Sequence, residues 1–459
     1  MASNPVDDTT QPVPHLARRL GLFDATMIVM GGIIGSGIFI NPYVVARQVQ
    51  TPFLILAVWA LGGLIALAAA FIWAELASLR PDVGGQYAYL REAYHPLVAF
   101  LYGWGLLLVI QTGGMAAVAV TFARYFLELT RLPVADWTVA VLALGGLTVI
   151  NCLGVRAGSS VQSLLMVLKI VAIVALIICG LWLAGPQPES AAGWVDRPVS
   201  LNLLTAIGAA MVPVLFAYGG WQTASFVSGE IREPRKNLPR ALIIGVTGVV
   251  LLYLGVNFIC VRALGVSGLA NTTTPASDVM RLALGATGAR AIAAGIAIST
   301  LGFLSQGMLT APRVYYAMAE DGLFFKSVGR LHPRTKAPIL AIFLQGLCAI
   351  LIALSGRYEQ ILNYVVSVDF IFFGATALCI FIFRRRMKAT TVNLSETDNV
   401  NARITKVPGH PVTTAVFVAV CWVVVINTVY RYPENTLIGL AILLAGIPAF
   451  FLWRWSNSK

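Results

Sequence analysis

The sequence has 459 residues, of which 58% are hydrophobic and only 11% charged, and its mean hydropathy is +0.81. Soluble domains average about 25% charged residues, so this composition excludes a large soluble domain and indicates an integral membrane protein. The formal net charge of +12 lies in loops between apolar segments, so it does not indicate nucleic-acid binding.

The chain contains twelve apolar segments that we predict to be transmembrane helices, because a helix needs about 20 mostly apolar residues to cross a bilayer. The polar residues 1–20 lack the apolar core and cleavage site of a signal peptide, so they are expected to remain as a cytoplasmic tail before an anchoring first span. The segments are residues 21–47, 53–79, 97–126, 137–155, 160–184, 202–230, 239–262, 289–319, 338–355, 358–383, 412–431 and 435–453.

The first segment is interrupted by the stretch GGIIGSGIF, residues 31–39. Glycine destabilises a helix interior by about 1 kcal/mol relative to alanine, so this composition predicts a break. The sixth segment carries a second break, FAYGGWQT, residues 216–223. If residues 21–184 and 202–383 are two repeats of five spans, the breaks occupy the same place in each, and the second repeat is inverted. Interrupted spans at corresponding places indicate a transporter's binding site, and residues 412–453 add two further spans.

Lysines and arginines are distributed unevenly between alternate loops, with most of them on the side of the N-terminal tail. Cytoplasmic loops carry such an excess, so both termini are expected in the cytoplasm. Residues 80–96 are too polar to span and contain three tyrosines, which predicts an amphipathic interfacial helix. Residues 386–411 are predicted to be a cytoplasmic linker. Glu75, near the inner end of the second span, is expected to be structural, bonded to loop backbone or to a basic loop.

A broken helix persists in a bilayer only where it lines a cavity or meets a ligand, because unpaired backbone groups are costly there. A half-helix that begins near Ser36 and Gly37 would expose amide groups at a positive dipole end, which suits a carboxylate. Carbonyl groups of Ile33, Phe216 and Gly219 would accept hydrogen bonds from an ammonium group. This combination matches the zwitterion of an α-amino acid. The alternative is that the glycines only allow close packing of helices.

Four stretches together resemble the amino acid–polyamine–organocation superfamily: IIGSGIF, GGQYAYL, FAYGGWQ and REPRKNLPRA. Within it they are most similar to the L-amino acid transporter branch and its bacterial serine/threonine-exchanger-like members. The resemblance runs from about residue 21 to the end of the tenth span. It implies an all-α membrane fold of the LeuT type, with twelve helices, a 5+5 inverted repeat and discontinuous helices 1 and 6.

The resemblance also implies roles for individual groups. The backbone groups named above would hold the two charges of the substrate, and the Phe216 ring would act as a gate over it. Gln222 falls where the family varies with side-chain preference. The mammalian relatives bond to a heavy subunit through a cysteine between spans 3 and 4, but ELTRLPVADW has no cysteine there. We therefore expect no heavy-subunit disulfide partner.

Lys169 is a charged residue deep within the fifth apolar segment. A lysine in this position costs about 2.5–3.5 kcal/mol on insertion scales, so it is expected to face protein or water rather than lipid. The alternative is a lysine that snorkels toward the cytoplasmic interface. The resemblance places Lys169 where related transporters bind sodium, which implies sodium-independent transport. A desolvated lysine also has the chemistry to couple the cycle to protons.

Asp369 is a second buried charge, near the middle of the tenth span, where the resembled family tends to have asparagine. Three roles are open for it: contact with the substrate side chain, a proton site, or a pair with a neighbouring polar group. Ser305 and Gln111 are further candidates for lining the substrate pocket, although small polar residues also join helices together. Many small residues around Gly113 leave room for a substrate and favour a neutral amino acid.

These observations predict a secondary active transporter of α-amino acids, a permease or exchanger that works by alternating access in the cell membrane. The alternatives are a proton-coupled amino acid or amine symporter or antiporter of the same fold, and a non-transporting membrane sensor. No P-loop, nucleophile elbow or metal-ligand cluster is present in the sequence, so an enzyme, a cofactor and a metal site are not expected.

Overall fold

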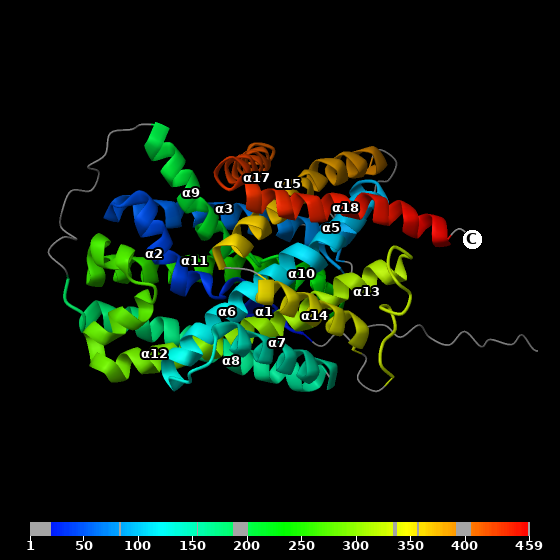
Figure 1. Cartoon of the computed structure of the whole chain (residues 1–459). Coiled ribbons are helices and arrows are strands. Elements are labelled where there is room, and N and C mark those ends of the chain that lie inside the picture. The colour runs from blue at the N-terminus through cyan, green and yellow to red at the C-terminus, as the bar shows by residue number, and fades with distance from the viewer. Residues whose placement is uncertain are drawn as a thin grey trace, which may run out of the picture.

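A computed structural model of the chain describes residues 20–81, 84–153, 155–186, 201–333, 337–355, 358–391 and 405–457. These residues are helical almost throughout, and most of the helices run along one common direction (Figure 1). The helices are α1 (Leu22–Ile33), α2 (Gly37–Val49), α3 (Pro52–Leu79), α4 (Gln86–Ala93), α5 (Pro96–Gly105), the π-helical turn η1 (Leu106–Ile110), α6 (Gln111–Thr130), α7 (Asp136–Leu153), α8 (Val155–Trp182), α9 (Leu201–Tyr218), α10 (Thr223–Phe226), the 3-10 turn η3 (Ser228–Glu230), α11 (Pro234–Asn271), α12 (Pro275–Thr310), α13 (Pro312–Glu320), α14 (Ile339–Ser355), α15 (Tyr358–Thr391), α17 (Val412–Arg431) and α18 (Pro433–Asn457).

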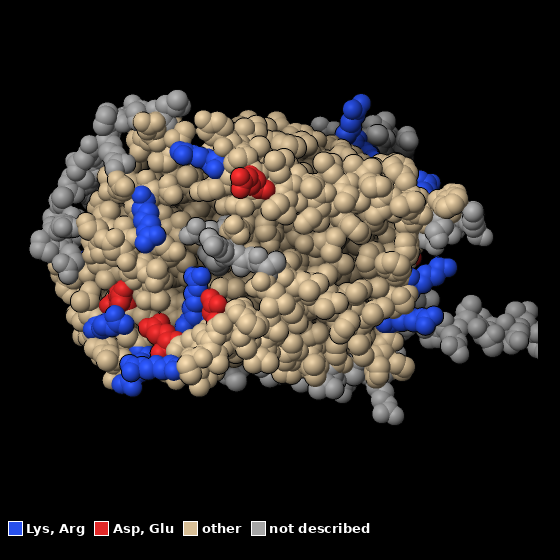
Figure 2. Space-filling model, viewed as in Figure 1, with Lys and Arg blue, Asp and Glu red and all other residues tan. Residues whose placement is uncertain are grey.

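The described residues contain ten helical spans that are long and apolar enough to cross a membrane. Two shorter apolar helices, Asp136–Cys152 and Ile339–Leu354, lie where the remaining two spans are predicted. The fold is therefore an all-α, multi-pass membrane fold, and the total of twelve spans stays a prediction. Figure 2 shows charged side chains toward the two ends of the visible face and a broad band between them that is almost free of charge.

Both predicted helix breaks are present. The first separates α1, which ends at Ile33, from α2, which begins at Gly37 with Ser36 as its N-cap. The second separates α9 from the short α10 at residues 219–222. Both breaks therefore lie inside the stretches predicted from the sequence, residues 31–39 and 216–223.

The two breaks lie inside the bundle, whereas the first turns of α9 are partly exposed. Helix α11 packs along α3 and α1, and α12 packs against α8 and α6. Helix α2 packs against α9, so the half of the first span that follows its break contacts the half of the sixth span that precedes its break. The glycines of the first stretch also allow close packing, because an added Cβ at Gly31 would meet the Gln306 side chain at 2.3 Å. Close packing and helix interruption thus occur in the same stretch.

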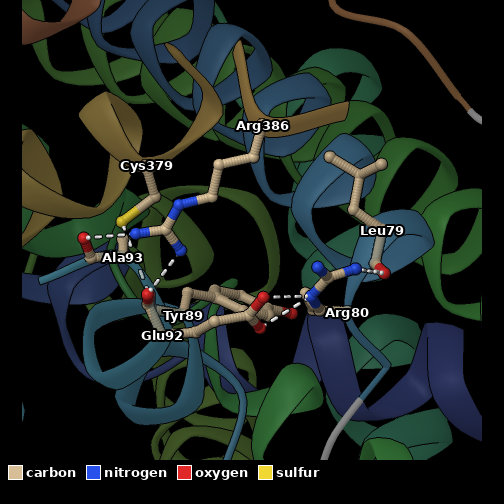
Figure 3. Close-up of polar contacts among 7 residues, drawn as sticks. All are labelled: Leu79, Arg80, Tyr89, Glu92, Ala93, Cys379 and Arg386. Carbon is tan, nitrogen blue, oxygen red and sulfur yellow. Dashed lines mark hydrogen bonds and ion pairs between the residues drawn. The ribbon is translucent and has the colours of Figure 1, made fainter. Parts of the chain in front are cut away.

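The polar stretch after α3 forms a shorter and more buried helix than predicted. Helix α4 spans eight residues, and both Tyr87 and Tyr89 within it are fully buried. Polar contacts tie the C-terminal end of this helix to neighbouring segments (Figure 3). Arg80 forms an ion pair with Glu92 at 2.6 Å, and Arg386 donates a hydrogen bond to the Glu92 carbonyl at 2.8 Å. Burial of Tyr87 beside the Asp321 carboxylate raises the pKa of its hydroxyl well above the usual range.

Glu75 has the structural role that the sequence predicts. Its carboxylate accepts two hydrogen bonds from Arg384, at 2.6 and 2.7 Å, and a third from the backbone amide of Val407 at 2.7 Å. This buried carboxylate therefore joins α3, α15 and the segment before α17. Most of the predicted linker, residues 392–404, lies outside the described residues.

Candidate functional site

A cavity of about 80 Å³ lies where the two helix breaks meet α6, α12 and α15. Its walls have two different characters. The breaks contribute backbone groups and small residues together with Gln222 and Thr223, and the other helices contribute both polar and apolar side chains. The lining residues that the argument below uses are Ser36, Gly37, Gln111, Phe216, Gly219 and Asp369.

Unpaired amide groups lie at the start of α2. The backbone N–H groups of Ser36 and Gly37 donate no hydrogen bond to any described residue, and the Ser36 hydroxyl is also buried without a partner. Buried backbone amides are almost always paired, so such groups in a cavity wall require an acceptor from what enters the cavity. The helix dipole of α2 adds positive potential at this point, which favours an anion.

The carbonyl groups at the breaks differ in how far they are already satisfied. The Ile33 carbonyl accepts from the Gly35 amide at 2.8 Å and from the Tyr253 hydroxyl at 3.1 Å, which occupies both of its lone pairs. Among the described residues, the Phe216 carbonyl accepts only from the Gly219 amide, at 3.2 Å. The Gly219 carbonyl accepts no hydrogen bond within the described part of the chain. Acceptors for an ammonium group are thus more available at the second break than at Ile33.

Tyr253, a residue of α11 that the sequence did not single out, connects the two breaks. Its hydroxyl lies 3.1 Å from the Ile33 carbonyl and 3.2 Å from the Ala217 carbonyl. Its side chain is fully buried and packs on Tyr218, with the ring centroids 5.0 Å apart. Only the fold brings this tyrosine to the breaks, because it lies about 30 residues from the nearer of them in an otherwise apolar segment.

Lys169 is buried in protein and does not snorkel. Its side chain is 2% exposed, and its ammonium donates a hydrogen bond to the Ile34 carbonyl at 2.5 Å. No carboxylate pairs with it among the described residues. The carbonyl that it contacts follows the last residue of α1, where the negative end of the helix dipole attracts a cation. The lysine thus neutralises the partial charge at the end of the interrupted helix.

The structure brings most of the predicted site residues together. Gln222 lines the cavity, and its side-chain oxygen accepts a hydrogen bond from the Gly220 amide at 3.1 Å. Ser305 does not line the cavity, because the next residue, Gln306, takes that place on the helix. Gln306 is bonded to the Ile28 carbonyl at 2.8 Å, which ties α12 to α1. Phe303 and Thr310 line the cavity as well, at the helical spacing that places them on one face with Gln306 and Gly307.

The sequence matches the model of the family described as amino acid permease over residues 20–447. This match covers both helix breaks, the cavity and every helix of the structure except the C-terminal part of α18. The chain belongs to the amino acid permease family. It is accordingly a membrane transport protein and not an enzyme.

Characterised relatives of this permease are amino acid transporters. The serine/threonine exchanger SteT of Bacillus subtilis (strain 168) is 29% identical over 449 residues, which cover 95% of this chain and 97% of the relative. The large neutral amino acids transporter small subunit 2 of Homo sapiens is 28% identical over 97% of this chain and 82% of its own length. The b(0,+)-type amino acid transporter 1 of Oryctolagus cuniculus is 30% identical over 80% of this chain and 76% of its own length.

Proposed function

We propose that this permease exchanges α-amino acids across the cell membrane without sodium, and that the breaks in its first and sixth spans hold the substrate zwitterion. The observation that carries the proposal is the pair of unpaired amide groups at Ser36 and Gly37. They lie in the same cavity wall as the carbonyl groups of Phe216 and Gly219, which accept one hydrogen bond and none, respectively, within the described residues. A carboxylate fits the amide groups and an ammonium group fits the carbonyl groups. Because these contacts use backbone only, they recognise the part that all α-amino acids share.

Lys169 supports the sodium-independent cycle in this proposal. A fixed ammonium group at the Ile34 carbonyl supplies the positive charge that a coordinated cation would otherwise supply at the end of a half-helix. The Ile33 carbonyl joins the substrate site only when it exchanges the Tyr253 hydroxyl for the substrate ammonium. This exchange links substrate binding to the contact between the two interrupted helices.

The proposal also covers topology and assembly. We infer two repeats of opposite orientation, residues 21–184 and 202–383, with both termini in the cytoplasm, since the basic residues gather in the loops on that side. One relative is named a small subunit, whereas the connection between α6 and α7 in this chain has no cysteine for a disulfide. We therefore propose that this polypeptide transports on its own.

The test is uptake by the purified protein in liposomes, with a panel of radiolabelled amino acids inside and outside the vesicles. Uptake that increases when unlabelled amino acid is loaded inside, and that is equal in sodium and choline buffers, is the expected result. Uptake that requires sodium would contradict the role of Lys169. Uptake that follows an imposed pH gradient without internal amino acid would identify a proton symporter instead of an exchanger.

A further inference from the structure

The backbone contacts of the proposed substrate site do not recognise the side chain of the substrate. Beyond the breaks, which add Ser36, Gln222 and Thr223, helices α6, α12 and α15 contribute polar side chains to the cavity wall, with Gln111, Thr310 and Asp369 among them. Asp369 is the one ionisable side chain among the residues that line the cavity. The cavity therefore offers a charged acceptor in addition to the groups that suit the zwitterion.

The protein does not satisfy the Asp369 carboxylate. Its Oδ1 atom is buried without a hydrogen-bond partner, and no ion pair to Asp369 occurs within the described ranges. Tyr102 and Cys421 are near enough to interact with it electrostatically, but neither is hydrogen-bonded to it. The buried cation Lys169 is bonded elsewhere, to the Ile34 carbonyl, and does not line the cavity. The third role considered from the sequence, a pair with a neighbouring polar group, is therefore not seen.

Asp369 is partly buried, and a carboxylate oxygen that neither water nor a donor reaches, as at its Oδ1 atom, is costly. The missing hydrogen bonds have to come from the contents of the cavity. A hydrophobic substrate side chain would remove water from Asp369 and give nothing in return. A hydroxyl or ammonium group would restore the lost hydrogen bond.

The size of the cavity limits the length of that side chain. The cavity of about 80 Å³ is small beside the pockets of about 300–1,000 Å³ that hold drug-sized ligands, which favours a short side chain. The Gln111 side chain restricts the cavity further. It lies against Gly307, where an added Cβ would be 2.6 Å from the Gln111 Nε2 atom.

We propose that Asp369 selects α-amino acids with a short side chain that carries an O–H or N–H donor, such as threonine, serine or a short diamino acid. The proposal rests on the proposed function, because it takes the zwitterion as held by the two helix breaks. The donor of the side chain bonds to the Asp369 carboxylate while the backbone groups hold the α-substituents. Asp369 is a specificity-determining residue, and the zwitterion contacts do not depend on it.

The experiment compares pairs of substrates of equal size in liposomes that contain the purified protein. The pairs are threonine with valine, and 2,4-diaminobutyrate with norvaline. For the unaltered protein we expect initial exchange rates at low substrate concentration that favour the donor-bearing member by roughly 10- to 100-fold, the effect of one hydrogen bond to a charged group. Preference for threonine alone assigns a hydroxyl ligand, and preference for the diamino acid alone assigns an ammonium ligand.

Three variants test whether Asp369 causes the preference for donor-bearing substrates. Asp369→Leu is expected to exchange valine and to reduce the threonine-to-valine ratio to near one. Asp369→Asn is expected to retain the preference for threonine, because its amide oxygen still accepts, and to lose the preference for the diamino acid. Thr376→Val removes a buried hydroxyl two turns along α15, outside the cavity, and is expected to leave both ratios unchanged.

Several outcomes would overturn the inference. Valine exchanged as fast as threonine by the unaltered protein is one, and an unchanged ratio in Asp369→Leu is another. If Asp369→Leu is not monodisperse in detergent, the unaltered protein and Asp369→Asn still decide the question. Loss of pH-driven uptake in Asp369→Asn with unchanged substrate ratios would assign a proton site instead. Absence of exchange with every amino acid would contradict the proposed function and is separate from these results.

Discussion

A carbon atom added at Gly220 would lie 2.0 Å from the carbonyl oxygen of Gly32, so the two interrupted helices touch backbone to backbone. Gly220 also has φ of +110°, a conformation that residues with a Cβ rarely adopt. The reverse contact is also too close for a side chain, because a Cβ at Gly32 would lie 2.6 Å from the Gly220 carbonyl. The cavity depends on this contact, since it sets the distance between the two breaks.

Gly220→Ala is therefore expected to lower the exchange rate by more than about tenfold. The added Cβ would strain the backbone at this φ and would clash with the Gly32 carbonyl. Gly145→Ala is the matched control, since an added Cβ there meets nothing within 4 Å. Initial rates of exchange at equal protein content in liposomes measure the effect. Normal exchange by Gly220→Ala would show that the two breaks do not need this contact.

Lys169→Met removes the ammonium group but keeps an unbranched side chain of similar length. We expect at least a tenfold loss of exchange, because a hydrogen bond from a charged donor contributes about 1.5–3 kcal/mol. Leu168→Met, at the adjacent and 44% exposed position, is the control for the new side chain. The contrary result is a Lys169→Met variant that exchanges as fast as the control in sodium-free buffer.

Tyr253→Phe removes the hydroxyl between the Ile33 and Ala217 carbonyls. Neutral hydrogen bonds contribute about 0.5–1.5 kcal/mol each, so we expect the exchange rate to fall by roughly 2- to 10-fold. Tyr218→Phe is a close control, because the Tyr218 ring packs on Tyr253 and its hydroxyl has no hydrogen-bond partner in the structure described. Equal rates for the two variants would mean that the bridge between the breaks does not matter for transport.

Glu230 and Arg313 form an ion pair between η3 and α13, with N and O atoms 3.2 Å apart and side chains that are 18% and 5% exposed. Glu230→Gln leaves the Arg313 charge buried without its partner, which typically costs about 3–5 kcal/mol. We expect a clear fall in the melting temperature of the detergent-solubilised protein. Restoration of stability by the double variant Glu230→Gln, Arg313→Met would support this explanation.

Glu233→Gln gives the comparison for the Glu230 experiment. Glu233 pairs with Lys236 at 3.6 Å, but these side chains are 71% and 57% exposed. Water and salt screen such a pair, so no measurable change in melting temperature is expected. A fall as large as that of Glu230→Gln would show that the loop itself, rather than burial of the pair, controls stability.

The location of the helix breaks was predictable from the sequence because glycine acts locally. GGIIGSGIF and FAYGGWQT weaken a helix wherever they occur, and α1, α2, α9 and α10 end and begin at these stretches. The role of Glu75 was predictable for a similar reason, since a carboxylate at the inner end of a span needs a partner among many basic residues. The buried setting of α4 was not predictable, because its tyrosines would equally suit a membrane interface.

The cavity itself depends on contacts between distant segments. Ser305 and Gln306 are both polar residues of one segment, and only the rotation of α12 decides that Gln306 faces the cavity. The Tyr253 hydroxyl meets the Ile33 carbonyl across 220 residues of chain, a pairing that no local pattern marks. Periodicity places a residue on a helix, but the packing of neighbouring helices decides what that residue touches.

The sequence by itself determined that this protein crosses the membrane many times and interrupts two of its helices at glycine-rich stretches. Apolar length and glycine content act along the chain, so these properties need no knowledge of the fold. Only the tertiary structure decided that Gly32 meets Gly220, that Lys169 bonds to the Ile34 carbonyl and that Asp369 stays unpaired in the cavity wall. These are relations between side chains and backbone groups of different helices, and packing fixes them all at once.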